Sequence, residues 1–214
     1  HNSTSGVSKQ FNLSNVTPVA TNNADVVTSF NSDGFTLGAD VTGGSNASSN
    51  RYFALGISAV PLVTGVELVT YVGTGAAGNN VSHNLGIEPE VIIILNEDDN
   101  NADIPVYQGF VLNVVYDNPQ QAYIRQIITT TFTTGDLNIW DNTSPTSTQF
   151  TVGNSTLTNA LGTNYTAIVM RSVSGLTNFG MFQGSGGVGS IQTQLEFKPK
   201  ILWQKALNSA QTWV

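Results

Sequence analysis

Only a few residues of this 214-residue chain have the types and spacing that catalysis or metal binding requires. The acidic stretch NEDDNNAD (96–103) places Asp99, Asn101 and Asp103 at alternate positions, and their carboxylate and amide oxygens are ligands that Ca²⁺ prefers. The glycine and the distal glutamate of an EF-hand loop are absent. The matching stretch QKALNSAQ (204–211) has no carboxylate. We therefore interpret 96–103 as a solvated loop that holds a weak calcium candidate, and we expect no cofactor.

The other reactive side chains lack partners for acid–base or nucleophilic chemistry. His83 lies in a turn motif, VSHNLG, and the only other histidine is His1. Glu88 and Glu90 flank Pro89 at the start of an apolar run and are interpreted as structural. The glycines of GSGGVG (184–189) precede neither a Lys-Ser/Thr pair nor a helix, so a phosphate loop is disfavoured. The sequence predicts a protein that is not an enzyme.

Composition excludes several partners. The net charge is −7 and the seven Lys and Arg residues are scattered, so the chain lacks the basic stripe of a nucleic-acid-binding protein. No apolar run is long enough for membrane insertion by a helix. The absence of cysteine excludes disulfides and thiolate metal sites. Charged residues make up only 10% of the chain, and Asn, Ser, Thr and Gly replace them, as is typical of extracellular or virion β-proteins.

The segments that would position these residues have the character of β-strands. Alternating or continuous runs of Val, Ile, Thr, Tyr and Phe recur every 8–12 residues and are separated by turn residues. The run PEVIIIL is expected to be a strand buried on both faces. No segment has a helical apolar stripe. The predicted strands cover 52–58, 67–74, 89–95, 110–117, 123–132, 136–140, 149–153, 165–173, 179–184 and 199–205.

The chain also contains an internal repeat. Four stretches match others further along the chain in the same order. The separation falls slowly from 115 to 110 positions, as small loop deletions would produce. The matched pairs begin at Phe35 and Phe150, Tyr52 and Tyr165, Tyr71 and Phe182, and Leu85 and Leu195.

The repeat predicts two related units with a permuted boundary. The first unit covers residues 35–149, and the second covers residues 150–214, completed by residues 1–34 of the same or a neighbouring chain. The predicted fold class is all-β, with two β-sandwich or jelly-roll-like units and little or no helix. Six large apolar residues are predicted to line the assembly seam: Phe11, Val26, Phe30, Phe197, Trp203 and Trp213.

The repeated motifs resemble a β-rich repeat of phage tail-fibre and other virion structural proteins. Asn31 to Gly38, Tyr52 to Ala54, Tyr71 to Gly75 and Val81 to Leu95 carry the resemblance, and EFKPKILWQKALNSAQTWV repeats its second half. Asn96 stands where the pattern usually has Lys, although Lys205 keeps it in the second copy. The resemblance implies a non-enzymatic virion protein, either a fibre, a tail component or a capsid decoration. Its implied partners are further copies of itself, other virion proteins and a host-surface glycan.

Two other functions stay open at this point. The permuted boundary also fits a secreted filament or surface-layer subunit that assembles by strand donation, which would be extracellular. A carbohydrate-binding module would need exposed aromatic side chains for stacking on sugars. The candidates for that role are Trp140, Trp203, Trp213 and Tyr107.

Overall fold

The protein folds around antiparallel β-sheets, which confirms the all-β prediction. The computed structural model describes residues 9–11, 20–22, 27–39, 48, 51, 56, 58–98, 104–109, 118–125, 132–182, 184, 186–187, 195–202 and 204. Helical structure in this part is limited to single turns. The strands are β1 (Lys9–Phe11), β2 (Ala20–Asn22), β3 (Val27–Asn31), β4 (Gly34–Leu37), β5 (Val66–Val72), β6 (Asn79–Ser82), β7 (Val91–Asn96), β8 (Pro105–Gln108), β9 (Ile124–Arg125), β10 (Gln149–Val152) and β11 (Asn164–Met170). The helical turns are α1 (Pro61–Thr64), η1 (Pro119–Gln121) and α2 (Thr156–Asn159).

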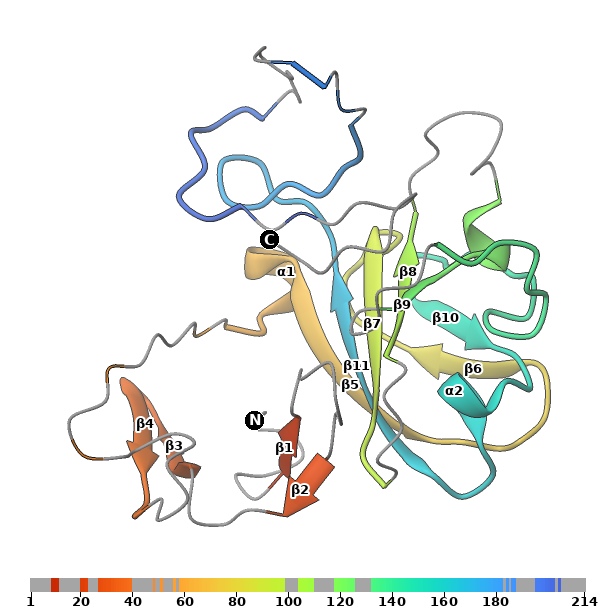
Figure 1. Ribbon diagram of the computed structural model, residues 1–214, viewed down its shortest axis with the longest axis horizontal. Coiled ribbons are helices and arrows are strands. Elements are labelled where there is room, and N and C mark those ends of the chain that lie inside the picture. Colours follow the sequence, from red (N-terminus) through yellow and green to blue (C-terminus); the bar gives the residue numbers. More distant parts are fainter. Residues whose placement is uncertain are drawn as a thin grey trace.

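A five-stranded antiparallel sheet forms the centre of the molecule, with the strand order β5-β11-β7-β8-β9 (Figure 1). β11 lies between β5 and β7, so Tyr165 is opposite Tyr71 on one side and Asn96 on the other. The side chains of β7 alternate between the two faces of the sheet, and four of its six residues are buried. This confirms that the run PEVIIIL forms a strand buried on both faces.

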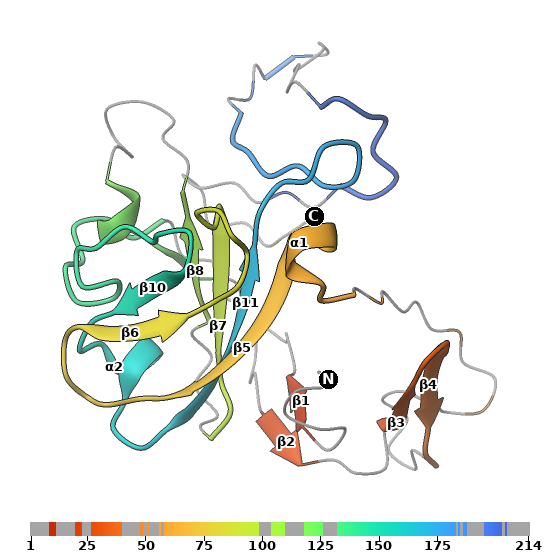
Figure 2. The same ribbon diagram turned by 180° about the vertical axis from the view of Figure 1, so that it is seen from behind.

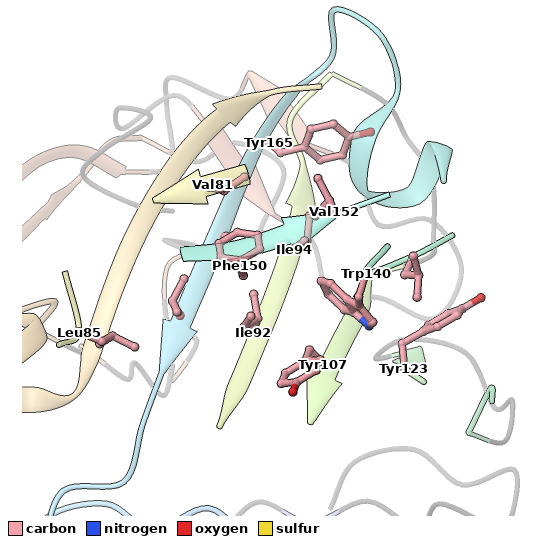
Figure 3. Packing of buried hydrophobic residues seen from close by; sticks show 13 residues of the cluster. Val81, Leu85, Ile92, Ile94, Tyr107, Tyr123, Trp140, Phe150, Val152 and Tyr165 are labelled. Atoms are coloured by element: carbon pink, nitrogen blue, oxygen red, sulfur yellow. The ribbon is translucent and has the colours of Figure 1, made fainter. Parts of the chain in front are cut away.

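A second layer, the ribbon of β6 and β10, packs across one face of this sheet (Figure 3). Phe150 and Val152 of β10 pack on Ile92 and Ile94 of β7. Trp140 fills the end of the core, and its indole N–H donates to the carbonyl of Ala122 at 2.8 Å. The two layers form a sandwich whose buried aromatic and β-branched side chains account for its stability.

The opposite face of the sheet is also apolar but less deeply covered. Val91, Val106 and Ile124 form a small cluster there, with Met170 and Phe179 packed against it. Phe179 follows β11 in the chain, so the segment after β11 folds back over this face. A sheet with two apolar faces explains why its strands lack the simple alternation of an exposed sheet.

Two separate hairpins precede the sandwich. β1 pairs with β2, and β3 pairs with β4 across the turn at Asp33 (Figure 1). Both views place the β3–β4 hairpin away from the five-stranded sheet (Figure 2). No strand pairing in the described part joins either hairpin to the sandwich.

Some predicted strands differ from the structure. Residues 136–140 form turns, because Ile139 and Trp140 enter the core from a loop and make no ladder hydrogen bonds. The described residues of 179–184 and 199–205 are not in strands. Residues 110–117, 52–55 and 57 lie outside the described residues. Predicted strands 67–74, 89–95, 149–153 and 165–173 correspond to β5, β7, β10 and β11.

The sandwich combines strands from both predicted repeat units. β10 and β11, which the repeat assigns to the second unit, pair with β6, β5 and β7 of the first. The predicted boundary at residue 150 therefore falls inside β10. The two-unit division remains a prediction about the sequence, and the described sheet is continuous across its boundary.

Candidate assembly surface

Large apolar side chains are exposed in the segments on either side of the sandwich. On the β3–β4 hairpin, Phe30 is 42% and Phe35 is 48% exposed. After β11, the exposed side chains are Leu176, Phe182, Ile201 and Leu202. Exposed apolar side chains also occur in the sandwich, for example Leu137 and Leu161, and single ones are normal on a protein surface. Phe35 and Phe182 differ from these because their repeat counterparts pack against each other in the sandwich. We call the hairpin with its following residues (27–58) the N-terminal segment, and the residues after β11 (171–204) the C-terminal segment.

Two short stretches of the C-terminal segment have the same backbone features as their repeat counterparts in the sandwich, although its described counterparts of β5 and β7 are not in strands. Gly75 follows β5 with φ 70°, and its repeat counterpart Gly186 has φ 73°. This left-handed conformation favours glycine, which explains the residue type at both sites. Residues 85–90 and 195–200 also share one pattern of bends separated by irregular positions.

A second pair of glycines differs in its surroundings. A Cβ atom on Gly73 would lie 2.0 Å from the carbonyl oxygen of Ala160, so only glycine allows β5 to approach the α2 region. Its counterpart Gly184 has no atom within 4 Å of the same position. The C-terminal segment therefore has the residues of a β5 end without the neighbour that β5 packs against.

The two segments leave the sandwich at the same corner. The N–H of Arg171 donates to the carbonyl of Gly65 at 2.8 Å, where β11 ends and β5 begins. The Arg171 guanidinium also reaches the carbonyl of Leu62 in α1 at 3.4 Å. A Cβ on Gly65 would come within 2.7 Å of the Val173 side chain, so the two exits are in close contact.

The carboxylates of the sandwich hold strand ends together. Asp98 accepts hydrogen bonds from both the backbone and side-chain N–H groups of Asn164, each at 2.7 Å. Glu67 accepts equivalent bonds from Asn84. Glu90 accepts from the backbone N–H of Ser172. These contacts are structural, as the sequence suggested for Glu90.

His83 caps its own turn. Its Nδ1 accepts from the N–H of Leu85 at 3.3 Å, and its Nε2 lies 3.2 Å from the carbonyl of Thr146. Burial lowers the pKa of His83, although the hydrogen bond to Thr146 and the charge of Glu67 act in the opposite direction. The neutral ring, with its proton on Nε2, satisfies both contacts. This arrangement is that of a histidine that caps its own turn.

Two of the aromatic residues considered for sugar stacking are core residues. Trp140 and Tyr107 are both 1% exposed and pack edge to face, with ring centroids 5.5 Å apart. Burial raises the pKa of the Tyr107 hydroxyl well above its ordinary value. Neither ring is available to a sugar, so the prediction for these two residues is wrong.

The predicted seam residues fall partly in the described regions. Phe30 is exposed on β3, and Phe197 is partly exposed in the C-terminal segment. Phe11 lies in β1. Val26, Trp203 and Trp213 lie outside the described residues, as do the calcium candidates Asp99, Asn101 and Asp103. Within the described regions, no group of three His, Cys, Asp or Glu side chains is arranged to hold a metal ion.

Sequence reasoning missed other exposed residues of this surface. Phe35 and Phe182 occupy aromatic positions of the repeat whose counterparts, Phe150 and Tyr71, pack against each other in the sandwich. The repeat alignment could have identified both residues, because an aromatic position that is buried in one copy of the repeat is expected to be buried in the other copy as well.

No helix in the described part is both long and apolar enough to cross a membrane.

Comparison with known proteins places the chain in a family. No curated protein and no solved structure is significantly similar to it. One family pattern, described as "Domain of unknown function (DUF7483)", matches residues 2–214. Since that match covers nearly the whole chain, the protein belongs to the DUF7483 family.

Proposed function

We propose that the protein is a non-enzymatic structural component of a virion, either a fibre, a tail component or a capsid decoration, and that it acts by self-assembly. One observation carries the proposal. The described sandwich buries a core that includes Phe150, whereas Phe35 and Phe182 of the flanking segments are exposed although their repeat counterparts, Phe150 and Tyr71, pack against each other. Burial of these aromatic side chains against another chain would be favourable, because it removes apolar surface from water.

Composition and sequence resemblance support the same proposal. The low charge content and the Asn-, Ser- and Thr-rich surface suit a protein that functions outside cells, on a particle. Asp98, Glu67 and His83 are engaged in structural hydrogen bonds, which leaves these three without an obvious catalytic task. Attachment to a host-surface glycan remains part of the proposal for residues outside the described sandwich core.

The proposal is tested by the state of the purified chain and its presence in particles. Sedimentation velocity at micromolar concentration is expected to show ordered oligomers, and electron microscopy is expected to show fibres or closed assemblies. Mass spectrometry of purified particles from the source culture is expected to detect the chain. A strictly monomeric chain that is also absent from particles would rule the proposal out.

A secreted filament or surface-layer subunit is the second candidate. It is favoured by β5, a seven-residue edge strand whose outer side has no strand partner in the described part of the chain. Long edge strands with few charges accept strands from other chains. Detection of the chain in cell-surface fractions that contain no particles would favour this candidate over the virion component.

A further inference from the structure

The outer edge of β5 is an open strand edge. β5 pairs with β11 along all seven of its residues without a bulge, and no strand in the described part of the chain pairs on its other side. β5 is the outermost strand of the sheet in both views (Figures 1 and 2). Proteins usually protect such an edge with proline, lysine or a bulge, and β5 has none of these. The edge can therefore accept another strand.

The hydrogen bonds at the two ends of β5 show which backbone groups this edge offers. Gly65, just before β5, accepts from the N–H of Arg171 at 2.8 Å, and Gly73, just after it, donates to the carbonyl of Thr163 at 2.8 Å. Hydrogen bonding alternates along an antiparallel pair, so the odd-numbered residues of β5 face β11. The residues that point their N–H and C=O groups outward are Val66, Leu68, Thr70 and Val72.

These outward groups are almost unused in the single chain. Among the described residues, the one hydrogen bond to them is a contact of 3.4 Å from the side-chain amide of Asn79 to the carbonyl of Val72. Thr70 is exposed, and the side chain of Val72 is 55% exposed. The middle of the edge therefore presents free donors and acceptors beside an apolar side chain.

We propose that a second copy of this chain occupies this edge, with its own β5 antiparallel to the first about a two-fold axis at Val69. The inference rests on the proposed self-assembly and deepens it by naming the partner strand and the register. Such a contact uses the same surface on both copies, so it closes as a dimer. The two five-stranded sheets then form one continuous sheet.

The residues of β5 match one another in this register. A pairing centred on Val69 is the one that brings all seven residues of both strands together, with Val66 opposite Val72 and Leu68 opposite Thr70. The outward backbone groups of each copy then meet those of the other. The exposed side chain of Val72 is covered by Val66, which removes apolar surface from water.

Charge does not oppose this pairing. Glu67 is the one charged residue of β5, and its carboxylate accepts hydrogen bonds from the backbone and side-chain N–H groups of Asn84, at 2.5 and 2.8 Å. In the register centred on Val69, Glu67 lies opposite Tyr71, so the two copies of Glu67 do not face each other.

The described segments of the same chain do not occupy this edge. Strands β1 to β4 pair within their own hairpins in the described part. After β11, Phe179 packs against Val91, Val106 and Ile124. These three residues belong to β7, β8 and β9, on the opposite side of β11 from β5. This placement and the self-matching register favour a second copy over a segment of the same chain.

Disulfide trapping tests the pairing in the full chain, which has no native cysteine. Val69→Cys places one thiol of each copy on the two-fold axis, in a non-hydrogen-bonded pair whose Cα atoms are about 4.5 Å apart, within the range that a disulfide spans. On mild oxidation we expect a covalent dimer and loss of the free thiol. The matched control is Val72→Cys, which is exposed on the same strand but lies opposite Val66 and far from the Val72 of the second copy. We expect little covalent dimer from it.

Thr70→Pro provides a second test that does not depend on cross-linking. The N–H of Thr70 points outward, so proline at this position removes no hydrogen bond to β11 and is tolerated on an edge strand. It removes a donor of the proposed pairing and places its ring against the second copy. We expect the dissociation constant from sedimentation velocity to rise about tenfold or more, with an unchanged circular dichroism spectrum. Thr70→Ser keeps the N–H and should associate like the wild type.

Equal cross-linking of Val69→Cys and Val72→Cys would overturn the pairing at Val69. Association of Thr70→Pro as tight as that of Thr70→Ser would overturn it too, and so would a wild-type chain that stays monomeric at micromolar concentration. The proposed function would survive each of these results if the chain is found in particles. Failure of this pairing and failure of the proposed function are therefore distinguishable.

Discussion

Tyr165 and Tyr71 lie opposite each other on β11 and β5, with their rings stacked at a centroid distance of 5.2 Å and an interplanar angle of 14°. The two residues are far apart in sequence and come from different sequence repeats. The Tyr165 hydroxyl accepts from the N–H of Ala160 and donates to the carbonyl of Thr156, each at 2.9 Å. The pair therefore fixes both the strand register and the α2 turn.

Truncation of Tyr165 is expected to be severely destabilising. Tyr165→Ala removes a fully buried ring and should lower the free energy of unfolding by about 3–5 kcal/mol, as other buried aromatic truncations do. Tyr165→Phe keeps the stack but leaves two backbone groups without their partner, at a cost of about 1–3 kcal/mol. Urea denaturation measures both. Equal losses for the two variants would show that the stacked ring contributes little.

Stability is expected to fall in mild acid through His83. Its pKa is lowered in the folded state, so the unfolded chain binds the proton more tightly. The stability that His83 contributes is fully present above its pKa in the unfolded chain, about 6.5. It is lost as the pH falls through the lower pKa that His83 has in the folded chain. Protonation of Nδ1 would also break the hydrogen bond from Leu85.

The measurement compares urea unfolding of the wild type and His83→Asn between pH 7 and pH 4. Asn keeps a short acceptor but does not titrate, so the carboxylates contribute equally to both proteins. The stability difference between the two is expected to shrink as the pH falls. A difference that stays constant with pH would contradict the assigned role of His83.

Replacement of the side-chain amide of Asn159 is expected to destabilise the fold. This buried side chain donates to the carbonyls of Gly153 and Ala76 at 2.6 and 2.7 Å and accepts from the N–H of Thr74 at 2.7 Å. Asn159→Asp has nearly the same shape but cannot make both donations, and we expect a loss of about 2–5 kcal/mol in thermal or urea unfolding. Asn154→Asp, an exposed change five residues away, is the control and should be near neutral.

Substitutions at Gly73 and at its repeat counterpart Gly184 are expected to distinguish effects on the stability of the single chain from effects on its assembly. Gly73→Ala should destabilise the single chain by about 1–3 kcal/mol or more, because its Cβ meets backbone. Gly184→Ala meets nothing in the single chain, so its melting temperature should be unchanged. If Gly184 packs like Gly73 in an assembled sandwich, Gly184→Ala should weaken oligomers in sedimentation. Oligomers that form normally in Gly184→Ala would argue against that packing.

A charge on the exposed hairpin should weaken self-association. Phe35→Asp removes an aromatic side chain whose burial would contribute about 1.5–3 kcal/mol, or roughly tenfold or more in the dissociation constant. Leu161→Asp is the matched control, since Leu161 is 81% exposed and lies outside both flanking segments. Sedimentation velocity over a concentration series is expected to show a weaker association for Phe35→Asp alone. A similar shift for both variants would mean that added charge, not this surface, sets the association.

The sequence was sufficient for the all-β class and for the strongest strands. β5, β7, β10 and β11 were predictable because their apolar residues recur with strand periodicity, and the His83 turn was predictable from its motif. The region of Trp140 was predicted wrongly, because apolar residues of a buried loop look the same as those of a strand. A local sequence pattern indicates that a side chain is buried, but it does not indicate which hydrogen bonds the backbone of that residue makes.

The sequence by itself determined the strand character of most apolar segments and the order of the repeated motifs. Only the tertiary structure decided that β11 inserts between β5 and β7, so that the complete unit joins the end of one repeat to the beginning of the next. Such pairing joins residues about 70 to 100 positions apart, so it depends on strand register and packing in the folded chain and not on local sequence. For the same reason, only the folded chain showed which aromatic side chains of the repeat are buried, such as Phe150, and which are exposed, such as Phe35 and Phe182.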